Sequence, residues 1–131
     1  MDRSREINMA EALNQAIWLR DNVEKLDRDS MEVAIKDLAS HRLFSSRQIS
    51  AIVNGALDHG SIAKLIKKED KTGGNLNVGT LEILRNVLYS RANNQTDYKL
   101  ISKALEEGTS QGMIARLTGV SQSSISRRLN G

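Results

Sequence analysis

The sequence contains no cysteine and no proline, and its aromatic residues are one Phe, one Trp and two Tyr. Without cysteine the chain forms no disulfide and offers no thiolate to a metal. The two histidines, His41 and His59, have no carboxylates at a recognisable ligand spacing, so we expect no metal and no cofactor. Aliphatic side chains must build the core. Because the chain is rich in Ala, Leu, Ile, Glu and Lys, its composition predicts an all-α fold.

Long apolar runs are also lacking. No stretch approaches the roughly 20 apolar residues that a membrane-spanning helix requires. The N-terminus is charged, unlike a secretory signal peptide. We therefore expect no membrane partner and a cytoplasmic location, either associated with the nucleoid or in the host cytoplasm if the protein is viral.

Positive charge is scarce in the first third of the chain. Residues 1–40 carry a net charge of −3, whereas residues 41–71, 72–96 and 97–131 carry +3, +1 and +2. A DNA surface must present positive charge to phosphates. The first third is therefore not predicted to form such a surface, while the remainder is compatible with one.

The most informative segment runs from residue 109 to residue 129 and predicts two short helices joined by a tight turn. Ala115 is small enough for a second helix to pack against the first. Gly119 tolerates the positive φ of the turn, and Val120 then enters the core. Ser121 stands at the expected N-cap. Ile125 and Leu129 lie four residues apart on one face, directed toward Ile114.

The outward positions of this segment carry side chains that suit DNA. Gln forms two hydrogen bonds with adenine, Arg bonds guanine or phosphate, and Ser bonds either base edges or phosphate. Ser110 caps the first helix and directs backbone N–H groups toward a phosphate. The predicted DNA contacts here are Ser110, Ser121, Gln122, Ser123, Ser126, Arg127 and Arg128.

This segment resembles the helix-turn-helix of phage Cro-type repressors and the C-terminal DNA-binding domain of serine resolvases and invertases. The resemblance covers about residues 97–131. Thr118 departs from the usual apolar residue before the glycine. The matching residues are Ile114, Ala115, Gly119, Val120, Ser121, Gln122, Ser123, Ile125 and Leu129. The alternative is a helical hairpin of an ordinary all-α domain with a solvated Ser and Arg surface.

A second, weaker pattern of the same kind spans residues 44–68. Ser45 and Gln48 form a capping box, Asn54 and Gly55 end the helix, and Asp58 caps the next one. The apolar faces are Ile49, Ile52 and Val53 in the first helix and Ile62, Leu65 and Ile66 in the second. The turn is two residues longer than in the C-terminal segment. The unit is either a second DNA-binding unit or a helix-turn-helix-like structural one. Its predicted DNA contacts are Ser46, Arg47, His59, Gly60, Lys64, Lys67 and Lys68, with Ala63 on the same face.

The remaining chain predicts further helices. Residues 5–27 form a helix whose apolar stripe packs either on its own domain or on a second copy, as a homodimer through residues 5–27. The stripe consists of Met9, Ala12, Ala16, Leu19, Val23 and Leu26, widened by Leu13 and Ile17. Asp29 and Glu32 form a capping box that opens the next helix, with Met31, Ile35 and Leu38 inward. A later helix begins at Asn77 or Thr80, with Leu81, Leu84, Val87 and Leu88 inward.

The polar stretch 91–96 is the best linker candidate. It divides the chain into an N-terminal helical domain, residues 1–92, and a C-terminal three-helix module, residues 97–131. Tyr98 begins the first helix of that module, and Gly108 ends it. A core this small is expected to dock on the rest of the chain or to be stabilised by DNA.

No catalytic constellation is present, so we expect no enzymatic activity. The pattern predicts a sequence-specific regulator of transcription that binds double-stranded DNA, of phage or bacterial type, with repression favoured over activation. Two helix-turn-helix units would read a bipartite site. The alternatives are a DNA-packaging adaptor similar to a terminase small subunit, and a helical protein-interaction module without DNA binding.

Overall fold

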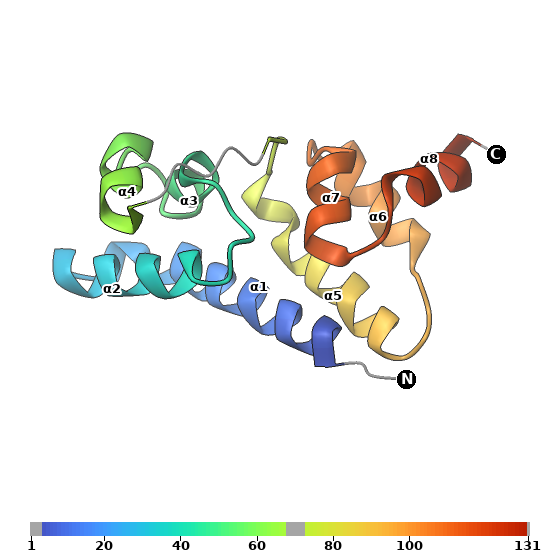
Figure 1. Cartoon of the computed structure of the whole chain (residues 1–131), viewed down its shortest axis with the longest axis horizontal. Helices are drawn as coiled ribbons and strands as arrows, with labels where there is room; N and C mark the ends of the chain where they lie inside the picture. The colour runs from blue at the N-terminus through green and yellow to red at the C-terminus, as the bar shows by residue number, and fades with distance from the viewer. Residues whose placement is uncertain (1–3, 68–72, 131) are drawn as a thin grey trace. The chain divides into compact units, whose positions relative to one another are not determined.

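The computed structural model describes residues 4–67 and 73–130, and these residues form helices and no strand (Figure 1). The all-α fold is therefore confirmed. The α-helices are α1 (Ser4–Asn22), α2 (Arg28–Ala39), α3 (Ser46–Ile52), α4 (His59–Ile66), α5 (Leu81–Ala92), α6 (Tyr98–Glu106), α7 (Gln111–Thr118) and α8 (Gln122–Asn130). Two short 3-10 helices, η1 (Val23–Lys25) and η2 (Val78–Thr80), follow α1 and precede α5.

The chain divides into two compact units. The inner unit is Gln15–Gly73, and the terminal unit combines Met1–Asn14 with Gly74–Gly131. This grouping differs from the predicted division at residues 92–97. Helix α5 packs on α6 and α7, so its core belongs with the C-terminal helices. The predicted linker is a turn within the terminal unit, in which Asn94 takes a positive φ of 63°.

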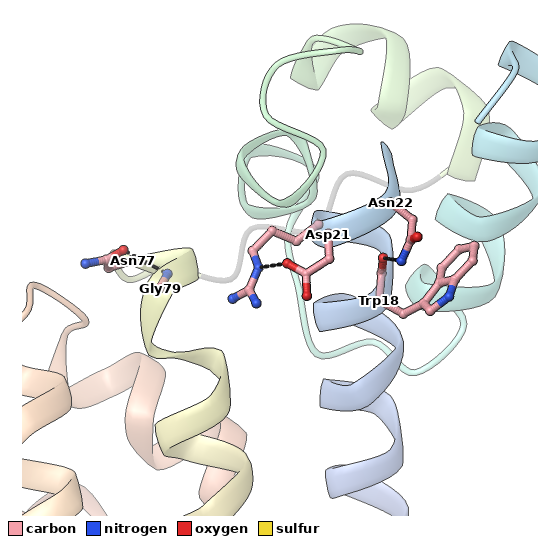
Figure 2. A network of polar contacts seen from close by, with 6 residues as sticks. Trp18, Asp21, Asn22, Asn77 and Gly79 are labelled. Carbon is pink, nitrogen blue, oxygen red and sulfur yellow. Dashed lines mark hydrogen bonds and ion pairs between the residues drawn. The ribbon is translucent and has the colours of Figure 1, made fainter. Parts of the chain in front are cut away.

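Helix α1 ends earlier than residue 27, because Asn22 is followed by a 3-10 turn. The side-chain amide of Asn22 donates to the carbonyl of Trp18 at 2.8 Å, as Figure 2 shows. Four residues of the predicted stripe are buried in a single chain: Ala12, Ala16, Leu19 and Val23. For these residues the structure shows packing within the chain. A homodimer through residues 5–27 stays a prediction.

The start of α2 corrects one prediction. Asp27, not Asp29, is the N-cap, and it accepts a hydrogen bond from the Ser30 N–H at 2.8 Å. Asp27 has the extended backbone that a cap requires, whereas Asp29 already lies in the first helical turn. There its negative charge interacts favourably with the positive end of the helix dipole. The predicted inward residues Met31, Ile35 and Leu38 are all buried.

The predicted start at Asn77 or Thr80 lies at η2, since α5 itself begins at Leu81; Thr80 makes no side-chain cap bond, and the capping residue is Asn77. Its side chain accepts the Gly79 N–H at 2.9 Å and caps η2, which continues into α5 (Figure 2). The Asn77 side chain also donates to the Glu107 carbonyl at 2.6 Å, and its backbone N–H donates to the Thr109 hydroxyl at 3.0 Å. These bonds fasten the start of α5 to the connection between α6 and α7, beside the C-terminal hairpin.

Candidate nucleic-acid interface

The terminal hairpin, residues 110–130, consists of α7, a turn and α8. Ser110 caps α7 as predicted, accepting the Met113 N–H at 3.3 Å. The N–H of Ser110 itself donates to the Asn75 carbonyl at 3.0 Å, and its hydroxyl also accepts the Asn75 N–H at 3.2 Å. Ser110 therefore already has protein partners for both groups.

The turn of this hairpin has the predicted geometry. Gly119 takes a φ of 78° and its N–H closes α7 on the Ala115 carbonyl at 2.9 Å. Val120 then enters the core and is 3% exposed. Thr118, the unusual residue before the glycine, is buried. Its hydroxyl donates to the Ile114 carbonyl at 2.7 Å and accepts the Val120 N–H at 3.3 Å, so its polar group is satisfied inside the core.

Helix α8 begins at its predicted cap and packs on α6 and α7. The Ser121 hydroxyl accepts the Ser124 N–H at 3.1 Å. Ile125 is fully buried, as predicted. Leu129 is a correction, because it is 38% exposed and does not join Ile125 in the core. The core of the hairpin is already filled by Met113, Ile114, Leu117, Val120 and Ile125, which leaves the last turn of α8 at its rim.

The outward face of α8 presents hydrogen-bonding side chains to solvent. Gln122, Ser123 and Arg127 are exposed, and Ser126 is half-buried with the Asn130 amide donating to its hydroxyl at 3.2 Å. Residues 110–130 include three arginines and no acidic residue. Five of the predicted contact residues, Arg128 among them, thus share one helix in a positively charged segment.

Gln122 lies closer to α7 than the sequence indicates. A Cβ placed on Gly112, in the first turn of α7, would come 2.8 Å from the Gln122 side-chain nitrogen. The carboxamide therefore rests against a position where any larger residue would displace it. Gly112 was not predicted as a functional residue, since its closeness to Gln122 arises from the packing of two helices.

Arg128 differs from its neighbours on α8. Its guanidinium lies over the ring of Tyr98, at the start of α6, 5.2 Å from the ring centre. A cation at this distance is attracted to the face of the ring. A shallow cavity of about 480 Å³ adjoins this pair and is lined by residues 95–99, Ser90 and Arg128. The sequence does not indicate this pairing, because the two residues come from different helices.

The inner hairpin, residues 45–67, consists of α3, a longer turn and α4. The predicted capping box is present, with the Gln48 N–H donating to the Ser45 hydroxyl at 3.2 Å and the Ser45 N–H donating to the Gln48 side chain at 2.8 Å. Asn54 and Gly55 take positive φ values of 54° and 75° as predicted. The Ser50 hydroxyl donates to the Leu57 carbonyl at 2.7 Å and steadies the longer turn.

Asp58 caps α4 as predicted, accepting the Ser61 N–H at 2.7 Å. This backbone hydrogen bond, together with the one from the Ser61 side chain, lowers the pKa of the Asp58 carboxyl below its ordinary value of 3.8. Burial opposes this lowering of the pKa, and weaker electrostatic interactions with the neighbouring His59 and Lys64 add to it.

The predicted contact residues of the inner hairpin are mostly accessible. Arg47, His59, Gly60, Lys64 and Lys67 are exposed, and Ser46 and Ala63 are half-buried. Lys68 lies outside the described residues. Whether any of these residues touches DNA stays a prediction.

Two other features, a metal-binding group and a membrane-spanning helix, were sought among residues 4–67 and 73–130. Within these ranges no three His, Asp or Glu side chains are grouped so as to hold a metal ion. None of the helices described is both long and apolar enough to cross a membrane.

Comparison of the chain with protein-family models, curated proteins and solved structures gave no match. The residues of the two hairpins are therefore the features of the chain that indicate a function.

Proposed function

We propose that this protein is a sequence-specific regulator of transcription that binds double-stranded DNA through α8. The observation that carries the proposal is the outward face of α8. Gln122, Ser123 and Arg127 are exposed on this face. The helix itself is held in place by the buried side chain of Ile125 and by the turn before it. These side chains suit hydrogen bonds with base edges in the major groove.

The electrostatics of the terminal hairpin support the same proposal. Phosphate contacts supply much of the affinity of a DNA-binding protein and require positive charge near the groove. Residues 110–130 include Arg116, Arg127 and Arg128 and contain no acidic residue. The resemblance of this segment to Cro-type repressors favours repression by occupancy of the site, with no catalytic step.

Selection of bound sequences from random duplex DNA tests this function. The full chain is incubated with the duplexes at moderate salt, and the bound fraction is sequenced over several rounds. We expect a defined motif to emerge, because Gln122 and Arg127 discriminate between base edges by hydrogen bonding. Enrichment without any motif would contradict sequence-specific reading, and the absence of enrichment would contradict DNA binding altogether.

A further inference from the structure

The inner and terminal hairpins begin in the same way. A serine caps the first helix of each, with Ser45 accepting from Gln48 at 3.2 Å and Ser110 accepting from Met113 at 3.3 Å. In each unit the second helix packs on the first helix and on the helix before the hairpin, so that α4 contacts α3 and α2 as α8 contacts α7 and α6. The serine cap and the contacts of the second helix with the two helices before it therefore occur twice in the chain.

The two turns also agree at their first residue and at the residue before the second cap. Asn54 and Gly119, each five residues after a buried isoleucine of the first helix, both take a positive φ, of 54° and 78°. Leu57 and Val120, each directly before the cap of the second helix, are 5% and 3% exposed. The two hairpins thus correspond at both ends of the turn, although the inner turn is longer.

The second helices match most closely. Asp58 caps α4 through the Ser61 N–H at 2.7 Å, and Ser121 caps α8 through the Ser124 N–H at 3.1 Å. Four residues after each cap, Ile62 and Ile125 are fully buried. These isoleucines fix which face of each helix is turned away from the core.

Counted from the buried isoleucines, the outward faces carry corresponding side chains. The residue three positions before is His59 in α4 and Gln122 in α8, and both side chains have donors and acceptors that can bond base edges or phosphates. The residue two positions after is Lys64 in α4 and Arg127 in α8, a cation in each case. All four are exposed.

Positive charge gathers on the inner hairpin as it does on the terminal one. Arg47, Lys64 and Lys67 are all exposed. Asp58 is the only acidic residue of the sequence between positions 45 and 67, and its carboxylate is engaged as the helix cap. With histidine neutral, this segment carries a net charge of +2.

We propose that the inner hairpin is a second DNA-reading unit, which places α4 in a major groove with His59 and Lys64 toward the bases. Arg47 and Lys67 neutralise phosphates at its sides. This inference rests on the function proposed for α8. Since the two helices present different side chains, the chain recognises two unlike sequences, and its full site is composite rather than a simple repeat.

The test is sequence selection with the full chain and three variants. The inner variant is His59→Ala with Lys64→Ala, and the terminal variant is Gln122→Ala with Arg127→Ala. The control is Lys36→Ala, which removes an exposed positive charge from α2. Because all these side chains are exposed, the variants are expected to melt at nearly the same temperature as the natural protein.

We expect the natural protein to select a motif with two unlike parts. The inner variant should lose one part, the terminal variant the other, and the control neither. A motif that the inner variant leaves unchanged, while the terminal variant abolishes it, would overturn the second unit and leave the proposed function standing. If the natural protein selects no motif, the proposed function itself is contradicted.

Discussion

Single residues in the terminal hairpin separate folding from recognition. Ser121 and Gly119 shape the backbone, Ile125 fills the core, and Gln122 and Arg127 point away from it. A substitution at an exposed position therefore changes what the helix touches more than it changes stability. Gly112 combines both roles, because it is part of helix α7 and also lies against the side chain of Gln122, a predicted contact residue.

Gly112→Ala is expected to stabilise the fold while altering DNA recognition. Alanine favours the helix over glycine by up to about 1 kcal/mol. Its Cβ would meet the Gln122 side-chain nitrogen at 2.8 Å, and that flexible side chain must move. Thermal melting should show an equal or higher melting temperature, and a binding assay should show a changed preference at the base that Gln122 contacts.

The matched control for this prediction is a double-mutant cycle with Gln122→Ala. If Gly112 acts by positioning Gln122, adding Gly112→Ala to Gln122→Ala should change the preference no further. An equal effect of Gly112→Ala in both backgrounds would show that Gly112 does not act through Gln122.

At the scale of helices and turns, the sequence predicted those caps and turn residues that depend on interactions within a few residues. The caps Ser45, Asp58 and Ser110 and the turn residues Asn54 and Gly119 were predicted because each bonds or bends the chain within a few residues. Asp27 was missed because Asp29 satisfies the same rule. Where two candidates are equivalent locally, packing elsewhere selects between them.

What the sequence did not reveal depends on contacts between distant elements. Arg128 over Tyr98, Gln122 beside Gly112 and the exposure of Leu129 all follow from how α8 meets α6 and α7. The grouping of the chain into two units differs from the predicted division for the same reason. A polar stretch looks like a linker in sequence, and only the packing of α5 on α6 places that stretch inside a unit.

The caps of α4 and α8 differ in charge, because Asp58 is ionisable and Ser121 is neutral. This difference gives a prediction about how the stability of α4 depends on pH. Because the pKa of Asp58 is lowered on folding, its charged form stabilises α4 at pH values above the ordinary carboxyl pKa of 3.8. That stabilisation is lost as the pH falls through the folded pKa. Asp58→Ser copies the neutral cap of α8 and should remove this dependence.

The measurement is thermal melting of the natural protein and Asp58→Ser from neutral pH downward. The melting temperature of the natural protein minus that of Asp58→Ser should stay constant until the pH falls below about 4. Below that pH the difference should decrease, because the natural protein loses the stabilisation from its charged cap. A difference that stays constant through the whole acid range would show that Asp58 does not contribute through its charge. Asp27, the cap of α2, provides an internal comparison, because the hydrogen bond from the Ser30 N–H lowers its pKa in the same way.

At the scale of the whole molecule, the chain contains two helical units, and each includes a hairpin with similar caps and contacts. Each hairpin has a serine-capped first helix and a second helix whose outward face is polar and positively charged. If both faces bind DNA, each engagement raises the effective concentration of the other and strengthens the complex without new contacts. This arrangement would let one chain recognise a longer site than a single small hairpin can.

The central claim, that α8 reads bases, is tested most directly by sequence selection with Arg127→Ala beside Lys103→Ala. Lys103 is an exposed cation on α6, so its replacement matches the change in charge without altering the outward face of α8. We predict that Arg127→Ala relaxes the preference at one part of the motif, by about 1–3 kcal/mol, while Lys103→Ala leaves the motif intact. A loss of binding that is equal for every sequence, or no loss at all, would contradict the claim.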